Sequence, residues 1–388
     1  MNTEADLVKY SLWNMTRYFL RLGALGFGGP VALVGFMHRD LVDERGWISE
    51  SDYREGLALA QIAPGPLAAQ LAIYLGFVHY RVLGATAVGL AFVLPSFLMV
   101  LGLGMAYTSY GGLPWMQAVF YGVGSAVLGI MAIGAHKLST KSIGKDKLLW
   151  AIFAVLAAVT IITQSEIVWL FIAAGVVVWL VRCKPNFSNR ALALVAPVDA
   201  AQLAPVLADP GLLIQIGVFF AKAGTFVFGS GLAIVPFLYG GTVTEHQWLT
   251  DRQFVDAVAV AMVTPGPVVI TTGFIGYLVA GFSGACMAAA ATFLPCYLIT
   301  IIAAPHFKKW GKNTSVIAFV DGITAAAIGA IAGSVVVIAQ RTLTDIPAAA
   351  LAIGATALLW KFKKIPEPVL VIGAALLGML VYPWMRHA

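Results

Sequence analysis

Charged side chains are scarce in this sequence, since Lys, Arg, Asp and Glu make up only 11% of its 388 residues. Soluble globular domains carry about 25% charged residues, so this chain has too few to cover a water-exposed surface. Hydrophobic residues make up 60% of the chain, and the mean hydropathy is +0.89. Apolar runs of about 20 residues, long enough to cross a bilayer, recur from end to end. The composition excludes a soluble protein and predicts an all-α polytopic membrane protein.

Metal-binding and catalytic motifs are also missing from the sequence. The three cysteines have no CxxC spacing, and the six histidines are scattered near loops and chain ends. No Walker A, GxSxG or HExxH motif occurs, so ATP-driven transport and the common membrane-enzyme chemistries lack their parts. We therefore expect no enzyme activity, no cofactor and no metal site. The polar first ten residues, followed by an apolar stretch with two arginines, are a poor cleavable signal peptide.

The net charge of +6 comes from short basic loops, such as 136–147 and 306–312. Cytoplasmic loops of membrane proteins collect Lys and Arg, so this excess reports topology and does not indicate a nucleic-acid partner.

The chain contains an internal repeat. The stretch RLGALGFGGP (21–30) aligns with KAGTFVFGSG (222–231) at an offset of 201 residues, and at the same offset Pro64-Gly65-Pro66 aligns with Pro265-Gly266-Pro267. Beyond one deleted residue the offset is 200, and the matches continue as Gly76 with Gly276, Gly84 with Gly284, Pro95 with Pro295, Gly122 with Gly322 and Gly129 with Gly329. We expect an N-terminal repeat (1–185), a polar linker rich in proline (186–209) and a C-terminal repeat (210–388).

Each repeat contains six apolar segments. They lie near 12–37, 56–78, 82–107, 113–135, 148–163 and 167–181 in the first half, and near 211–240, 254–281, 284–304, 314–340, 346–360 and 367–384 in the second. Matching loops carry opposite charge bias, which predicts that the two repeats are inverted in the membrane. Six full crossings would return each half to its starting side. A re-entrant hairpin in the first segment of each half resolves this, giving about ten crossings and two hairpins.

Four helix-breaking motifs lie inside these apolar segments, one pair in each repeat. Broken backbone at membrane depth is costly unless it is buried in protein or lines a cavity. A helix that restarts after Pro66 or Pro267 presents free N–H groups and a positive dipole end, which favour an anion. Broken helices at matching places in two inverted halves also indicate a transporter's central site. The alternative is that these Gly and Pro residues only kink helices for packing.

Charged residues near the breaks add candidates for the site. Arg21 and Lys222 occupy the same repeat position, and intramembrane cations are rare and usually functional. The alternative is that they extend to the headgroups. Glu55 and Asp256 also match and could carry a coupling proton, or they could be ordinary acids near a helix start. The predicted substrate-binding residues are Arg21, Gly28, Gly29, Pro30, Gln61, Pro64, Gly65, Pro66, Lys222, Gly229, Ser230, Gly231, Thr264, Pro265, Gly266 and Pro267, with Thr271 and Thr272 as nearby hydroxyls.

The motifs RLGALGFGGP, DERGWISESDY and LAQIAPGP, with their altered second copies FGSG and TPGP, resemble the chromate transporter (CHR) family in its long two-domain form. The resemblance covers nearly the whole chain. It departs at Ser230 and Gly231, which stand where the first repeat has Gly29 and Pro30, so the two halves of the site need not be equivalent.

This resemblance implies export of chromate across the bacterial cytoplasmic membrane, driven by the proton-motive force and conferring chromate resistance. Sulfate or another small oxyanion is the alternative substrate, and a membrane-embedded enzyme or lipid-handling protein is the alternative class. The bilayer is the expected environment, and a homodimer is left open.

Overall fold

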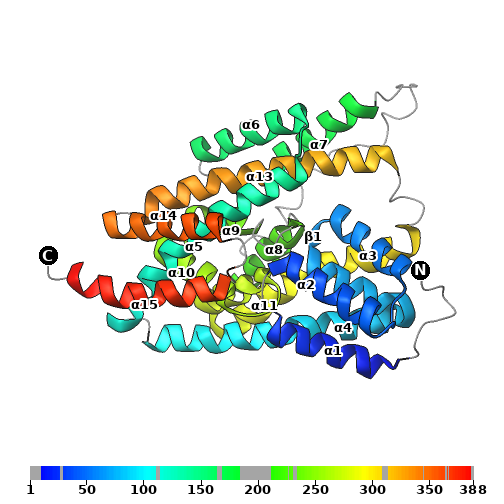
Figure 1. The fold of residues 1–388 in the computed structure, drawn as a ribbon, viewed down its shortest axis with the longest axis horizontal. Helices are drawn as coiled ribbons and strands as arrows, with labels where there is room; N and C mark the ends of the chain where they lie inside the picture. Colours follow the sequence, from blue (N-terminus) through cyan, green and yellow to red (C-terminus); the bar gives the residue numbers. More distant parts are fainter. Residues whose placement is uncertain are drawn as a thin grey trace.

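The computed structural model describes residues 10–26, 29–110, 114–163, 168–183, 211–225, 227–229, 234–307, 313–343, 345–362, 365 and 367–385. These residues are almost entirely helical. Figure 1 shows α6, α7, α13 and α14 along one edge of the molecule and α1 and α4 along the other, with α8, α9 and β1 between them. The predicted linker, 186–209, lies outside the described residues.

The elements of the first repeat are α1 (Leu12–Leu25), α2 (Gly29–His38), the π-helical turn η2 (Arg39–Glu44), α3 (Glu50–Ile62), the two-residue strand β1 (Gly65–Pro66), α4 (Leu67–Tyr110), α5 (Pro114–Ser142), α6 (Lys147–Thr163) and α7 (Val168–Cys183). Those of the second repeat are α8 (Leu212–Thr225), β2 (Phe228–Gly229), α9 (Val235–Tyr239), the π-helical turn η5 (Gly240–Glu245), α10 (Asp251–Val263), the 3-10 turn η6 (Val268–Ile270), α11 (Thr271–Ala303), the 3-10 turn η7 (Ala304–His306), α13 (Thr314–Thr342), α14 (Ile346–Lys361) and α15 (Glu367–Met385).

The two repeats share local structure at matching positions. Ser49 and Thr250, which match at the 201-residue offset, each cap the N-terminus of the following helix with a side-chain oxygen. The π-helical turns η2 and η5 precede these caps at the same offset. Each half also breaks its helices where the sequence predicts, around Gly26 and at the PGP motifs. The chain is therefore an all-α membrane protein built from two homologous repeats.

Four helical segments are long and apolar enough to cross a membrane by length and composition, namely Leu67–Tyr110, Trp115–Thr140, Val268–Ala303 and Thr314–Arg341, as far as the described residues go. The other apolar helices among them are shorter. The helix α4 bends sharply at Arg81 and α11 at Gly281, where the backbone is not helical. These bends fall at the predicted boundaries between the second and third apolar segments of each half. The count of about ten crossings stays a prediction.

The long helices α5 and α13 exchange partners between the repeats. The helix α5 packs against α14 and α15, and α13 packs against α6 and α7. Tyr121, near the start of α5, donates a hydrogen bond to Asp345, just beyond the end of α13. Asp321, near the start of α13, shares Arg182 with Asp146, just beyond the end of α5. The two helices also pack on each other, so these equivalent helices run antiparallel, as inverted repeats require.

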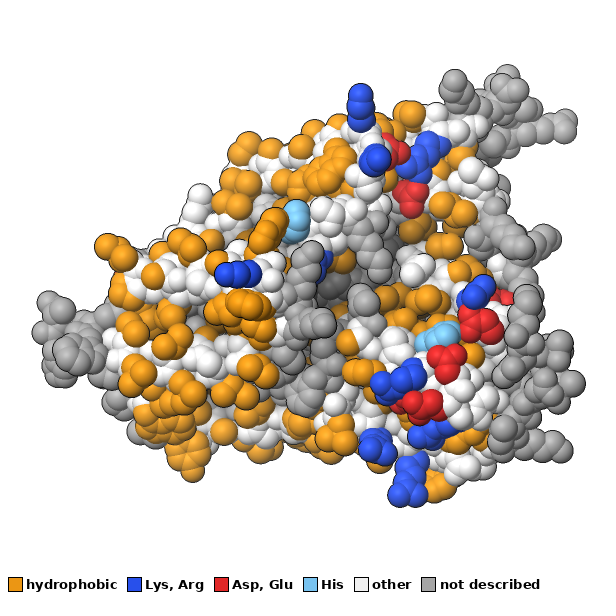
Figure 2. All heavy atoms as spheres, viewed as in Figure 1, with side chains coloured by type: hydrophobic (Ala, Val, Ile, Leu, Met, Phe, Trp, Pro, Cys, Tyr) orange, Lys and Arg blue, Asp and Glu red, His pale blue; other side chains and the backbone are white. Residues whose placement is uncertain are grey.

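The outer surface separates lipid-facing from water-facing parts. Large exposed apolar side chains line the outer faces of α4 and α11, among them Leu90, Leu94, Leu98, Leu294 and Leu298. Figure 2 shows hydrophobic side chains over much of the visible face, with charged side chains gathered toward the right end. A hydrophobic exterior with charge confined to the ends is the pattern of a chain surrounded by lipid.

Candidate functional site

The four helix breaks meet at the centre of the molecule, where each repeat pairs with the other. The amide of Gly65 donates to the carbonyl of Val227 at 2.5 Å, and the amide of Gly266 donates to the carbonyl of Gly26 at 2.9 Å. The strands β1 and β2 form a two-residue parallel pair there. Both hydrogen bonds join a PGP glycine of one repeat to the first break of the other, and the donor and acceptor positions match at the 201-residue offset.

Glycine is required at the two PGP centres. Gly65 has φ +142° and Gly266 has φ +93°, a backbone region that L side chains rarely adopt. A Cβ on Gly266 would lie 2.0 Å from Oγ of Ser96, and one on Gly65 would lie 2.5 Å from Cβ of Cys296. Ser96 and Cys296 match across the repeats, and each directly follows a proline inside its helix. The crossing is therefore packed by backbone and small side chains.

The amides of Gly65 and Gly266 are used between the repeats in this structure. The sequence predicts free N–H groups on the helices that restart after Pro66 and Pro267, which stays a prediction. The amides of Gly65 and Gly266 lie before those restarts, and each has a protein acceptor. Because buried amides need a partner, the pairing describes a closed crossing. A ligand that used these amides would have to replace the carbonyls of Val227 and Gly26.

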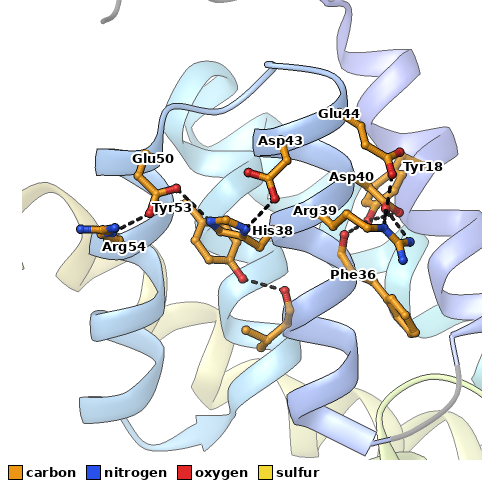
Figure 3. Close-up of polar contacts among 11 residues, drawn as sticks. Tyr18, Phe36, His38, Arg39, Asp40, Asp43, Glu44, Glu50, Tyr53 and Arg54 are labelled. Carbon is orange, nitrogen blue, oxygen red and sulfur yellow. Dashed lines mark hydrogen bonds and ion pairs between the residues drawn. The ribbon is translucent and has the colours of Figure 1, made fainter. Parts of the chain in front are cut away.

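A cavity of about 340 Å³ leads from the surface to the carboxyl end of α1. We call it the arginine cavity, and its lining residues are Tyr18, Arg21, Leu22, Leu25, Gly26, Phe36, Arg39, Asp40, Glu44 and Arg45. Arg39 pairs with Asp40 at 2.7 Å and with Glu44 at 3.4 Å. Arg45 lies over the ring of Tyr18, and Arg21 has no ion-pair partner among the described residues. Figure 3 shows Arg39, Asp40, Glu44 and Tyr18 converging beside Phe36.

The arginine cavity therefore carries a net positive charge and ends at the break. Its lining includes Gly26, whose carbonyl accepts the amide of Gly266. Cations that are only partly compensated attract anions into a cleft. This arrangement forms a polar route from the surface to the crossing of the two repeats.

A second polar cluster stands beside this cavity at the start of α3. His38 contacts Asp43 at 3.2 Å and Glu50 at 2.8 Å, and Arg54 contacts Glu50 at 2.5 Å (Figure 3). The hydrogen bond from His38, with help from Arg54, holds the pKa of the Glu50 carboxyl below its usual range. Tyr53 packs edge-on against His38 and donates to the carbonyl of Val34. The cluster fixes α2 against α3 and so shapes the cavity wall.

Another cavity of about 340 Å³, which we call the aspartate cavity, lies between α5 of the first repeat and helices of the second. Its lining residues are Phe120, Tyr121, Gly124, Ser125, Asp251, Arg252, Val255, Asp256, Arg341, Asp345, Ala348 and Tyr382. Asp256 is only 3% exposed, and Tyr107 donates to its Oδ2 at 2.8 Å. Asp251 accepts from Tyr239 and lies 3.6 Å from Arg341. The antiparallel course of α5 and α13 places this cavity at the opposite end of the molecule from the charged pairs of Arg182.

The structure separates the predicted site residues into groups. Central positions with described burial are Gly65, Pro66, Thr264, Pro265, Gly266 and Pro267, all buried, with Pro64 partly buried. Gly29 and Pro30 begin α2, and Gly229 ends β2. Arg21, Gln61 and Lys222 are exposed. Arg21 lines the arginine cavity, whereas Lys222 lines neither polar cavity described here. Gly28, Ser230 and Gly231 lie outside the described residues.

The matched acids have different surroundings in the two repeats. Asp256 is buried with Tyr107, whereas Glu55 is partly exposed and interacts with Tyr74. Thr271 and Thr272 are fully buried, and their hydroxyls donate to the carbonyls of the preceding turn. These two hydroxyls therefore satisfy local backbone in this structure. The two candidate acids, by contrast, differ in exposure between the repeats. A difference between the two halves of the site is what the altered motif of the second repeat leads us to expect.

Sequence reasoning missed three residues, two beside the crossing and one beside the aspartate cavity. Gln70 and Ser96 are 0% exposed next to the PGP motifs, and Tyr107 contacts Asp256 from a distant helix. A polar residue in an apolar segment four residues after Pro66 was a signal for Gln70, because buried amides in apolar segments need a partner. Nothing in the sequence pairs Tyr107 with Asp256.

Comparison with known proteins places the chain among membrane transporters. The chromate transporter family model matches residues 13–179 and again 214–379. The chain is 67% identical to "Chromate transport protein" of Cupriavidus metallidurans, over 97% of this chain and 95% of that protein. It is 59% identical to "Probable chromate transport protein" of Synechococcus elongatus, over 96% of each. It is 31% identical to "Chromate transport protein" of Pseudomonas aeruginosa, over 98% of this chain and 95% of that protein. No solved structure matches the chain.

Proposed function

The chain belongs to the chromate transporter family, and we propose that it is a secondary active exporter of chromate. It works in the bacterial cytoplasmic membrane, is driven by the proton-motive force and confers chromate resistance. The observation that carries the proposal is the 67% identity to a named chromate transport protein over 97% of this chain. Identity at that level, through both repeats, favours a common substrate class over fold similarity alone.

The arginine cavity is the anion entrance in this proposal. A chromate anion needs cations and N–H dipoles in place of its hydration shell. Arg21 supplies a cation with no ion-pair partner among the described residues, while Arg39 is compensated by Asp40 and Glu44. The route ends at the hydrogen bond between Gly266 and Gly26. Opening this closed crossing lets the anion pass between the repeats.

Asp256 is the proton-coupling residue in this proposal. An ionisable side chain buried at membrane depth is rare and costly, and it marks proton relays in transporters. The aspartate cavity connects it to Asp251, Arg252, Arg341 and Asp345, so protons can reach it from the end of the molecule where α13 ends. Glu55, its partly exposed counterpart, is not among the lining residues of either polar cavity. We therefore assign proton coupling to Asp256 in the second repeat and anion entry to the arginine cavity of the first repeat.

Flux of chromate, sulfate and phosphate into proteoliposomes, with and without a pH gradient, tests the proposal. We expect chromate movement that rises when protons flow in the opposite direction. Sulfate flux that exceeds chromate flux would identify sulfate as the preferred substrate. Chromate flux that does not depend on the pH gradient would contradict proton coupling but would still support chromate transport.

A further inference from the structure

Gln70 is a buried amide beside the crossing, and only one of its two N–H groups has a hydrogen-bond partner among the described residues. It lies in the first turn of α4 and is 0% exposed. Its Nε2 donates to the carbonyl of Pro64 at 2.7 Å. Its Oε1 accepts no hydrogen bond from any described residue, and no other buried side-chain nitrogen or oxygen in the described part of the chain lacks a partner.

The orientation of this amide follows from its partner. A carbonyl oxygen only accepts, so the group facing Pro64 must be the NH₂, and Oε1 must point the other way. The amide also packs against Gly65, since a Cβ there would lie 2.7 Å from its Cδ and Nε2. Gly65 donates across the crossing to Val227. The unused acceptor therefore lies next to the backbone segment that pairs the two repeats.

A buried acceptor without a donor is costly, and a ligand that carries a hydroxyl would satisfy it. A fully ionised oxyanion has only acceptors and would be repelled by Oε1. An oxyanion that holds one proton has both a hydroxyl and ionised oxygens. Gln70 offers the complement, because Oε1 can accept the hydroxyl while the second Nε2 hydrogen donates to a neighbouring oxygen.

We infer that Gln70 binds the singly protonated, hydroxyl-bearing form of a tetrahedral oxyanion when the crossing of the repeats opens. The inference rests on the proposed function and names the form of the substrate. Chromate takes up one proton near neutral pH, whereas sulfate does so only in strong acid. The same contact therefore selects hydrogen chromate against sulfate. The second repeat has no glutamine between its PGP motif and Gly276, so one repeat supplies this contact.

The test is counterflow of labelled chromate in proteoliposomes at equal pH on both sides, which removes any proton gradient. For the wild type we expect exchange that falls as rising pH depletes hydrogen chromate, with weak competition from sulfate. Gln70→Met keeps the length of the side chain and removes both hydrogen-bonding groups. We expect at least about tenfold slower exchange at low pH and a smaller preference for chromate over sulfate. The control Gln340→Met, on an exposed position of α13, should match the wild type.

Gln70→Glu keeps an acceptor oxygen at the same length, so it protects the test against a variant that fails to fold. We expect it to exchange chromate at low pH and to lose activity more steeply than the wild type as its carboxyl ionises. Unchanged rate, pH profile and selectivity in Gln70→Met would overturn the inference alone. So would an equal loss for chromate and sulfate, since that indicates a packing or water-binding role. A wild type without chromate counterflow would overturn the proposed function, and this inference with it.

Discussion

The amide of Gly65 donates to the carbonyl of Val227, and 201 residues later the amide of Gly266 donates to the carbonyl of Gly26 in the same way. Each repeat thus satisfies the broken backbone of the other. At membrane depth an unpaired amide costs several kcal/mol, so neither half can keep its breaks without its partner. The reciprocal pair explains why the breaks occur in both repeats and in register.

Alanine at Gly65 or Gly266 should disrupt this crossing. Both glycines have positive φ, which costs about 1–3 kcal/mol for other residues, and the new Cβ at Gly266 would lie 2.0 Å from Ser96 Oγ. We expect a lower melting temperature in detergent and loss of chromate flux for each variant. The control is Gly102→Ala, because nothing lies within 4 Å of a Cβ there and alanine favours a helix. Wild-type stability in Gly266→Ala would contradict the closed geometry.

Arg21 should matter more for transport than Lys222 or Arg17. Sequence symmetry alone predicts equal roles for Arg21 and Lys222, whereas the structure gives only Arg21 a place in the arginine cavity. We expect Arg21→Ala to raise the chromate KM about tenfold, a change typical of losing one charged contact. Arg17→Ala, on an exposed position of the same helix, is the control. Equal small effects at all three positions would indicate that these side chains only reach the headgroups.

Asp256→Asn should separate transport from its driving force. The amide keeps the size of the side chain and can still accept from Tyr107, but it cannot carry a proton. We expect chromate counterflow at equal pH to persist while flux driven by a pH gradient is lost. Glu55→Gln, at the matching and partly exposed position, should retain gradient-driven flux. The reverse result, with Glu55→Gln uncoupled and Asp256→Asn active, would move the coupling to the first repeat.

The sequence predicts where the helices break, but it does not predict which breaks pair with each other. The repeat offset and the Gly and Pro motifs locate all four breaks, because the backbone preferences of Gly and Pro act locally. Which break contacts which depends on pairing between segments that lie far apart in the chain, and no local rule specifies that. Gln61 and Gln70 show the same limit. Both flank the PGP motif, yet Gln61 is exposed on α3 and Gln70 is fully buried in α4.

Asp146 should make stability depend on acid pH. Its hydrogen bond to Arg182, at 2.6 Å, holds the pKa of this carboxyl below the usual range, and the site lies in the turn between α5 and α6. A lowered folded pKa stabilises the protein above the unfolded pKa of about 3.9, and this contribution is lost as pH falls through the folded pKa. We expect the melting temperature to drop less between about pH 6 and about pH 3 in Asp146→Asn than in the wild type. Parallel curves would contradict the linkage.

Replacing Pro64 and Pro66 together with alanine asks whether the PGP motif serves transport or packing. Proline in a helix interior costs about 3 kcal/mol, so alanines should favour joining α3, which ends at Ile62, to α4, which begins at Leu67. A joined helix would draw the Gly65 amide away from Val227 and shift the carbonyl that holds Gln70. We expect a folded and inserted protein that is about as heat-stable as the wild type, because the gain in helix offsets the lost hydrogen bond between Gly65 and Val227, yet is inactive.

That combination is the conflict between stability and activity expected of a strained functional element. The matched change at Pro265 and Pro267 should also lower flux, but less severely, because Gln70 belongs to the first repeat. Melting temperature and chromate flux measured on the same purified variants decide between the two roles. Full flux in the Pro64/Pro66 variant would make the break a packing feature, because the joined helix would then leave the anion path intact.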